Sequence, residues 1–172
     1  MSKYFLWLTS DGESRDRLAQ LIHQLSEQYR GPKFDPHITL LGEIEGEESR
    51  LIERVGLLAK KLRSLSIDLQ QPAFEDEYFR CLYFPVKKTP ELIDAHEQAK
   101  VILDKTSVLP FYPHVSLLYG LLPLGVKEDI IASLPSDIPN PFSVTTLTLV
   151  QAKSTKPQDW LVTNTFALSM VT

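Results

Sequence analysis

Two short segments of this sequence repeat the same pattern of a histidine followed by a hydroxyl residue. Residues 34–41 read FDPHITLL and residues 111–118 read FYPHVSLL. An imidazole can take up or release a proton near neutral pH because its unperturbed pKa is about 6.5. A neighbouring hydroxyl group can donate a hydrogen bond to an anion. The two copies together predict an acid–base site that holds an anion.

The alternation of polar and apolar residues in each segment predicts a β-strand. Successive side chains of a strand point to opposite faces, so His37 and Thr39 share one face and Ile38 points to the other. By the same parity His114 shares a face with Ser116. Each strand is therefore expected to present one imidazole and one hydroxyl group side by side.

The two segments belong to a longer internal repeat with an offset of 77 residues, the separation of the two histidines. The same offset aligns Phe34 with Phe111 and, in the strand expected before each motif, Trp7 with Phe84. A strand, a helix, the motif strand, a helix and a strand occur twice. Packing two such halves about a pseudo-two-fold axis would bury their apolar faces and make the two motif histidines face each other across a cleft.

Hydrophobic periodicity predicts the remaining elements. Beside the two motif strands, strands are expected at 3–9, 66–70, 78–86, 142–150 and 160–170, and amphipathic helices around 18–25, 51–62, 90–103 and 125–134. Thr89 is a candidate N-cap with Pro90 at the first helical position. The segments 42–47 and 152–159 are expected to be a turn and an exposed hairpin loop.

These elements predict an α+β, bilobal, pseudo-two-fold fold, in which mostly antiparallel sheets line a central cleft and the helices lie outside. The chain is expected to form a single domain over residues 1–172. Its two lobes correspond to the repeat, about 1–75 and 76–150, and a C-terminal hairpin strand follows at 160–170. His23 and His96 are expected to be helix residues outside the site, and Cys81 a buried strand thiol.

The composition is that of an ordinary soluble globular protein, with 43% hydrophobic and 23% charged residues. The net charge of −4 argues against a long nucleic-acid footprint, which requires a basic stripe, but is compatible with a small phosphorylated ligand. One cysteine cannot form an internal disulfide, and no signal peptide or membrane span is recognisable. We therefore expect a cytoplasmic monomer that binds no membrane.

Competing chemistries lack their parts in this sequence. The paired histidines do not have the helical spacing of a metalloprotease, and there is no cysteine cluster or Asp-rich metal loop. Glycine-rich dinucleotide and triphosphate loops are absent, and Ser116 lacks the glycine elbow of an esterase nucleophile. We expect no metal and no cofactor. Two acid–base groups around an anion holder fit phosphodiester cleavage.

The paired His-x-Thr/Ser motifs resemble those of the 2H phosphoesterase superfamily. Within it, the chain is more similar to the small plant and fungal-type cyclic phosphodiesterases than to the RNA-ligase-like branch. The resemblance rests on Trp7, on residues 31–34 before the first motif, on residues 79–81 at the start of the second half and on residues 113–119. It spans nearly the whole chain, from the first strand to the terminal hairpin.

The resemblance implies a site between two lobes, no metal requirement and hydrolysis of a five-membered cyclic phosphate to a monoester. Substrates of the family are ADP-ribose 1'',2''-cyclic phosphate and nucleoside 2',3'-cyclic phosphates, the latter opened to 2'-phosphates. One histidine would activate water while the other protonates the leaving oxygen. We expect His114 to be the base and His37 the acid, although the near-symmetry leaves the reverse assignment open.

The resemblance also assigns substrate contacts. Thr39 and Ser116 would hold the non-bridging phosphate oxygens, and Trp7 would stack on a base or ribose unless it is a core aromatic. Tyr119 resembles a substrate-contacting tyrosine, but strict alternation turns it away from the second motif histidine unless the strand ends first. Phe84 is a candidate substrate contact only through the internal repeat. Any redox-sensitive disulfide of plant relatives cannot form with a single cysteine.

Two alternatives remain beside hydrolysis of a small cyclic phosphodiester. One is a module that binds a phosphate ligand without turnover. The other is RNA processing at 2',3'-cyclic phosphate ends, as in 2'-5' RNA ligase-like proteins, for which the acidic net charge is unfavourable.

Overall fold

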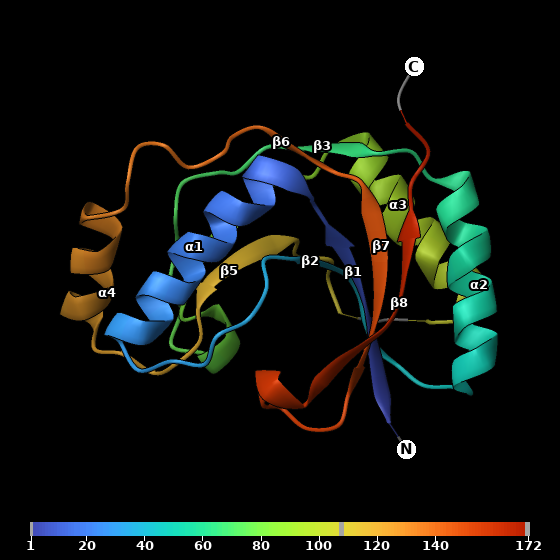
Figure 1. Ribbon diagram of the computed structural model, residues 1–172, viewed down its shortest axis with the longest axis horizontal. Coiled ribbons are helices and arrows are strands. Elements are labelled where there is room, and N and C mark those ends of the chain that lie inside the picture. The colour runs from blue at the N-terminus through green and yellow to red at the C-terminus, as the bar shows by residue number, and fades with distance from the viewer. Residues whose placement is uncertain (1, 107–108, 171–172) are drawn as a thin grey trace.

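The computed structural model describes residues 2–106 and 109–170 and has the predicted α+β fold (Figure 1). Its strands are β1 (Lys3–Thr9), β2 (Ile38–Ile44), β3 (Leu65–Ile67), β4 (Leu82–Pro85), β5 (His114–Leu118), β6 (Phe142–Val144), β7 (Thr146–Ala152) and β8 (Trp160–Ala167). The helices are α1 (Gly12–Gln28), α2 (Glu48–Lys61), α3 (Pro90–Ile102) and α4 (Leu124–Ala132), with the 3₁₀ helices η1 (Tyr78–Arg80) and η2 (Pro157–Asp159).

Six strands form one sheet in the order β4-β5-β2-β1-β7-β8, and every pairing in it is antiparallel. The two motif strands, β5 and β2, are neighbours in the second and third positions of this order. A small second sheet pairs β3 with β6. The predicted α+β fold with mostly antiparallel sheets is confirmed.

Helix α3 begins where the sequence predicts. The Thr89 hydroxyl accepts a hydrogen bond from the backbone N–H of Leu92 at the start of α3, and Pro90 occupies the first turn. None of the helices in the described part of the chain is long and apolar enough to cross a membrane.

The helices are exchanged between the two halves of the repeat. Helix α1, from the first half, packs on β5 of the second half, and α3, from the second half, packs on β2 of the first. Figure 1 shows α1 on the left above β5 and α2 and α3 together on the right. Strand β7 pairs with β1, at the other end of the chain. Each half therefore contributes to the packing around the motif strand of the other.

The strand register shows which residues are equivalent in the two halves. Trp7 pairs with Thr39, and Tyr83 pairs with Ser116. A register shift comes immediately before Trp7 in β1 and immediately before Tyr83 in β4. Because the motif hydroxyl residues are equivalent, Tyr83 and not Phe84 is the counterpart of Trp7.

This register corrects the prediction for Phe84. Phe84 pairs with Val115, is 5% exposed and belongs to the hydrophobic core, on the face turned away from the motif histidines. The offset of 77 residues holds for the motif strands. Applied to Trp7, which pairs with Thr39, it predicts Phe84, but the residue that pairs with Ser116 is Tyr83, one position earlier. The 77-residue alignment therefore identified Phe84, instead of Tyr83, as the residue beside the second motif hydroxyl.

Some element boundaries also differ from the predicted ones. The strand expected over 78–86 begins with η1, in which the Arg80 N–H donates to the Glu77 carbonyl and the Arg80 guanidinium pairs with the Glu77 carboxylate. Strand β2 continues through Gly42 to Ile44, where a turn was expected. The strand predicted over 142–150 is divided into β6 and β7, which belong to different sheets.

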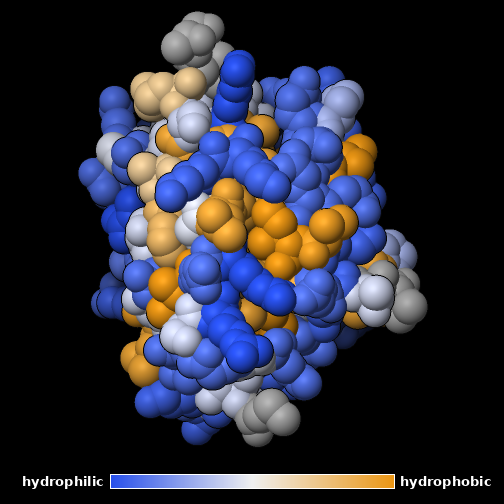
Figure 2. All heavy atoms as spheres, turned by 90° about the vertical axis from the view of Figure 1, so that its right-hand side faces the viewer, coloured by the Kyte–Doolittle hydropathy of each residue, from blue (hydrophilic) through white to orange (hydrophobic). Residues whose placement is uncertain are grey.

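The helix layer leaves some apolar surface uncovered. Figure 2 shows a group of hydrophobic side chains on the side where α2 and α3 lie in Figure 1. These two helices carry three exposed large apolar residues, Leu57 in α2 and Ile93 and Val101 in α3.

Candidate active site

The two motif strands meet at one residue pair. Ile38 of β2 pairs with Val115 of β5 in antiparallel register, and both side chains are buried in the core. The residues on either side of this pair point to the opposite face. The structure thus brings four predicted site residues together there: His37 immediately before β2, Thr39 in β2, and His114 and Ser116 in β5.

Both imidazoles are oriented by the same backbone contact. His37 Nδ1 lies 2.7 Å from the carbonyl oxygen of Asp35, and His114 Nδ1 lies 2.8 Å from that of Tyr112. A carbonyl oxygen can only accept a hydrogen bond, so Nδ1 carries the proton in each ring. Nε2 is left to act as a base when neutral and as an acid when protonated.

Burial makes both imidazoles harder to protonate. Burial lowers the pKa of His37 to about 4, the Asp35 carbonyl acts against this shift, and the nearby His114 lowers the pKa further. The pKa of His114 is also lowered, by burial and by the Arg80 guanidinium, while the carboxylate of Glu75 acts to raise it. The two histidines are thus similar in orientation but different in charged neighbours.

The two hydroxyl residues differ in their present contacts. The Ser116 side chain is 5% exposed, and its hydroxyl donates a hydrogen bond of 3.0 Å to the carbonyl oxygen of Phe79. Thr39 is half-buried beside Trp7. Ser116 must rotate its hydroxyl proton away from this carbonyl before it can donate to a bound anion.

Trp7 lies directly against the first histidine. The rings of Trp7 and His37 are stacked, with centroids 3.7 Å apart and planes inclined by 13°. The Trp7 side chain is only 8% exposed. Trp7 therefore packs against the site and excludes water from one face of the imidazole.

Tyr119 reaches the aromatic surroundings of the site because β5 ends one residue before it, at Leu118. Its ring stacks on Phe34, with centroids 3.9 Å apart, and Phe34 in turn lies edge-on to His37. The Tyr119 side chain is buried, and this burial raises the pKa of its hydroxyl.

The sequence reasoning missed Trp160, the first residue of β8. Its half-buried ring lies between 5.8 and 6.4 Å, centroid to centroid, from four rings around the site: Trp7, Tyr119, Phe79 and His37. The Trp160 indole N–H donates to the carbonyl oxygen of Ser154, which fixes the ring to its own hairpin. No local pattern could reveal this contact, because the hairpin folds back over residues far away in the sequence.

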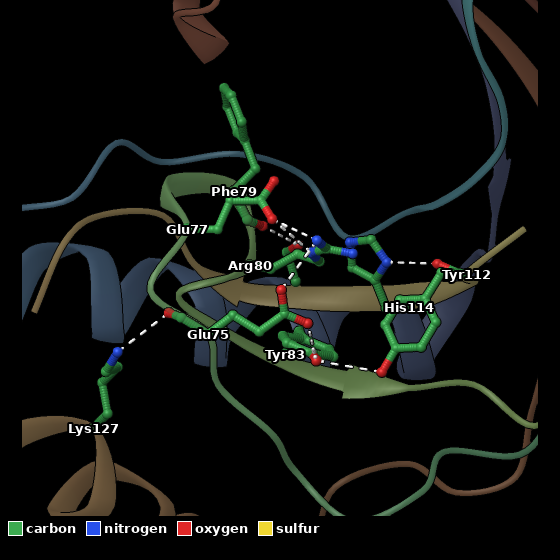
Figure 3. A network of polar contacts seen from close by, with 9 residues as sticks. Glu75, Glu77, Phe79, Arg80, Tyr83, Tyr112, His114 and Lys127 are labelled. Atoms are coloured by element: carbon green, nitrogen blue, oxygen red, sulfur yellow. Dashed lines mark hydrogen bonds and ion pairs between the residues drawn. The ribbon is translucent and has the colours of Figure 1, made fainter. Parts of the chain in front are cut away.

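A polar network lies beside the second histidine (Figure 3). The Arg80 guanidinium pairs with the carboxylates of Glu75, at 3.0 Å, and Glu77. The Tyr83 hydroxyl donates to Glu75 at 2.8 Å, and its ring lies edge-on to His114 at 5.4 Å. Neither repeated motif contains Glu75, Arg80 or Tyr83.

The other singled-out residues lie outside the site. His96 is a buried residue of α3: it is 7% exposed, its Nδ1 donates to the carbonyl oxygen of Leu40 at 2.7 Å, and its ring stacks on Phe111. Cys81 is buried, and burial raises the pKa of its thiol. Among the described residues, no group of three or more His, Cys, Asp and Glu side chains is arranged to hold a metal ion.

Comparison with solved structures identifies other proteins of the same fold. The fold resembles that of E. coli LigT in its apo form, with a TM-score of 0.60 and 19% identity over 98% of each chain. It also resembles that of TT0787 from Thermus thermophilus, with a TM-score of 0.64 and 19% identity over 98% of each chain.

The sequence comparisons identify the family of the chain. A cyclic phosphodiesterase of Arabidopsis thaliana is 27% identical over 128 residues, which are 73% of this chain and 70% of the relative. The family model described as cyclic phosphodiesterase-like protein matches residues 1–171. The chain therefore belongs to the cyclic phosphodiesterase-like family and is an enzyme of this kind.

Proposed function

We propose that the protein hydrolyses small cyclic phosphodiesters to phosphomonoesters by general acid–base catalysis with two histidines. One observation carries this proposal: His37 and His114 flank the single β2–β5 residue pair on one face, each with its Nδ1–H bonded to a carbonyl oxygen. Two Nε2 atoms are thereby available for one substrate. Membership of the cyclic phosphodiesterase-like family supports the same chemistry.

In this mechanism a water oxygen attacks phosphorus while one Nε2 takes the water proton. The bond from phosphorus to one ring oxygen breaks, and the other imidazolium supplies the proton to that oxygen. The lower pKa favours His37 as the base, because it is neutral over a wider pH range. His114, near the carboxylates of Glu75 and Glu77, would be the acid, which reverses the expected roles.

Thr39 and Ser116 would bind the non-bridging oxygens, with about 1.5–3 kcal/mol for each hydrogen bond to a charged acceptor. Trp7, Tyr119 and Trp160 would surround the ribose or the base, because Trp7 stacks on His37 and the Trp160 ring lies beside those of Trp7 and Tyr119. A base that stacks on an aromatic ring gains about 1–3 kcal/mol.

We propose ADP-ribose 1'',2''-cyclic phosphate, nucleoside 2',3'-cyclic phosphates, or both as substrates, with 2'-phosphates as products of the latter. LigT, which has this fold, has been solved in complex with 3'-AMP, NADP+ and ATP. The net charge of −4 also favours a small nucleotide over long nucleic acid. The single free cysteine is consistent with the proposed location in the cytoplasm, and we propose that the protein acts as a monomer.

The proposal is tested with purified protein, both substrates and excess EDTA, and product phosphates are identified by ³¹P NMR. We expect ring opening without added metal, and a strict metal requirement would contradict the mechanism. Binding of a cyclic phosphate without any product would support the alternative of a binding module. A strong preference for oligonucleotides with cyclic-phosphate ends, with steep salt dependence, would support RNA-end processing.

A further inference from the structure

We propose that Tyr83, held by Glu75 and Tyr112, is a positioning residue for His114. The inference rests on the proposed function and deepens it, because it says how one of the two histidines is kept in place. Tyr83 is 2% exposed and lies in β4, opposite Ser116 of the motif strand.

The contacts form a continuous chain from an acidic side chain to the imidazole. Tyr83 donates its hydroxyl proton to Glu75 Oε1 at 2.8 Å. Its hydroxyl oxygen lies 3.3 Å from that of Tyr112, and since the Tyr83 proton is already used, Tyr112 is the donor in this second bond. The backbone carbonyl of Tyr112 accepts the Nδ1–H bond of His114. The Tyr83 hydroxyl thus anchors the residue that orients the imidazole.

Arg80 contacts both residues that hold the Tyr83 hydroxyl group, Glu75 and Tyr112. Its guanidinium pairs with Glu75 at 3.0 Å and lies over the Tyr112 ring, with 5.6 Å from Cζ to the ring centroid. Figure 3 shows Tyr83, Glu75 and Arg80 gathered on one side of the His114 ring. The Tyr112 side chain is itself 43% exposed, so these contacts limit the motion of an otherwise open loop residue.

The first half of the repeat has no such anchor among its described residues. The equivalent of Tyr83 is Trp7, which stacks flat on His37 and has no hydroxyl group. The carbonyl that orients His37 belongs to Asp35, whose side chain makes an exposed ion pair with Arg15. Beyond the carbonyl bond that both share, His37 is held by ring stacking on Trp7, whereas His114 is held through the hydrogen bonds that Tyr83 makes to Glu75 and Tyr112.

The decisive variant is Tyr83→Phe, which keeps the ring against His114 and removes the hydroxyl group. We expect kcat to fall on the order of tenfold with KM changed less than about twofold, because a displacement of about 1 Å at a reacting group can cost about 10²-fold. Tyr4→Phe is the matched control, since Tyr4 is a buried β1 residue whose hydroxyl donates to Glu48 at 3.0 Å, on the core face. Unchanged kcat in Tyr83→Phe, or an equal loss in Tyr4→Phe, overturns the proposal.

Two further variants test whether the chain acts as a unit. Tyr112→Phe should reproduce the loss of Tyr83→Phe, and the double variant should lose no more than either alone. If the losses of kcat in the two single variants multiply in the double variant, the two hydroxyl groups act independently, which would contradict the proposal.

Glu75→Gln separates position from charge, because its amide oxygen can still accept the Tyr83 hydrogen bond. The charged and titratable groups around His114 are Arg80, Glu75, Glu77, Tyr83, Tyr112 and His37. Removing the Glu75 charge lowers the pKa of His114. In the pH–rate profile, the limb that reports titration of His114 should therefore move to lower pH. Tyr83→Phe should reduce kcat at all pH values with a smaller shift of this limb. A shifted limb in Tyr83→Phe with no loss at the optimum would contradict positioning.

A measurement on the free protein keeps this inference separable from the proposed function. In ¹H–¹⁵N spectra of the imidazoles, Tyr83→Phe should speed exchange of the His114 Nδ1 proton and leave that of His37 unchanged. The same change is expected even if no cyclic phosphate is hydrolysed. Equal exchange in the variant and the wild type would overturn the inference, while absence of turnover by the wild type would overturn only the proposed function.

Discussion

At the scale of single residues, the two histidines have the same orientation but unlike neighbours. Each uses Nδ1 to bond the carbonyl two residues earlier, so the motif itself sets which nitrogen faces the substrate. Trp7 stacked on His37 and Arg80 near His114 then make the two environments different. A pseudo-symmetric motif can thus supply an acid and a base from the same side chain.

Replacement of either histidine by asparagine should remove most of the activity. His37→Asn and His114→Asn are each expected to lower kcat by about 10² to 10⁴, because each removes one proton-transfer group. Binding of a non-hydrolysable nucleotide, measured by calorimetry, should change much less. Loss of binding with unchanged single-turnover rate would contradict the assigned roles.

The pH dependence of kcat/KM should be bell-shaped and lie on the acid side. Activity should rise as pH passes about 4, where His37 loses its proton and becomes a base. It should fall again as His114 loses its proton, at a pKa below its ordinary value of about 6.5. A rate that keeps increasing through about pH 7 would contradict this order of protonation.

At the scale of elements, the β7–β8 hairpin adds a residue to the site that neither motif contains. Its tip is held by internal bonds, with the Ser154 hydroxyl donating to Asp159 at 2.6 Å and the Trp160 indole donating to the Ser154 carbonyl. Trp160 reaches the rings around His37 from this tip. The hairpin is therefore expected to contribute to substrate selection and not to proton transfer.

Trp160→Ala should weaken binding of nucleotides and leave the chemistry intact. We expect KM for a nucleoside 2',3'-cyclic phosphate to rise about 5- to 160-fold, as base stacking contributes about 1–3 kcal/mol. Ribose 2,3-cyclic phosphate, which lacks a base, is the matched substrate and should be affected much less. Equal losses for the two substrates, measured by steady-state kinetics, would contradict base stacking.

Helix α3 is tied to the motif strand by a buried histidine. His96 donates to the Leu40 carbonyl of β2 and stacks on Phe111 in the loop before the second motif. His96→Ala should lower the free energy of unfolding by about 1–3 kcal/mol, because the buried carbonyl loses its donor. His23→Ala, at a half-buried position of α1, should cost less. The free energy of unfolding of both variants is measured by urea denaturation. Equal losses in the two variants would contradict the specific role of His96.

At the scale of the whole molecule, the lowered pKa of His37 links the site to folding. The unfolded chain binds a proton at this residue near pH 6.5, whereas the folded chain does so only near about pH 4. Stability should therefore fall as pH decreases from about 6.5 to about 4. His37→Asn should flatten the slope of unfolding free energy in this window, and an unchanged slope would show that the imidazole is not desolvated.

The sequence alone determined the features that depend on neighbouring residues. Alternation in residues 34–41 and 111–118 placed each histidine and hydroxyl on one face, and Thr89 was recognisable as an N-cap. The repeat also indicated that the two motif strands belong together. These inferences succeeded because side-chain period and capping are set by local backbone geometry.

Only the tertiary structure decided which distant residues meet at the site. The register shifts in β1 and β4 made Tyr83, not Phe84, the neighbour of Ser116. The folding of the β7–β8 hairpin brought Trp160 to His37, and the exchanged helices buried His96. Strand register and hairpin direction depend on packing between segments far apart in the chain, which periodicity within one segment does not record.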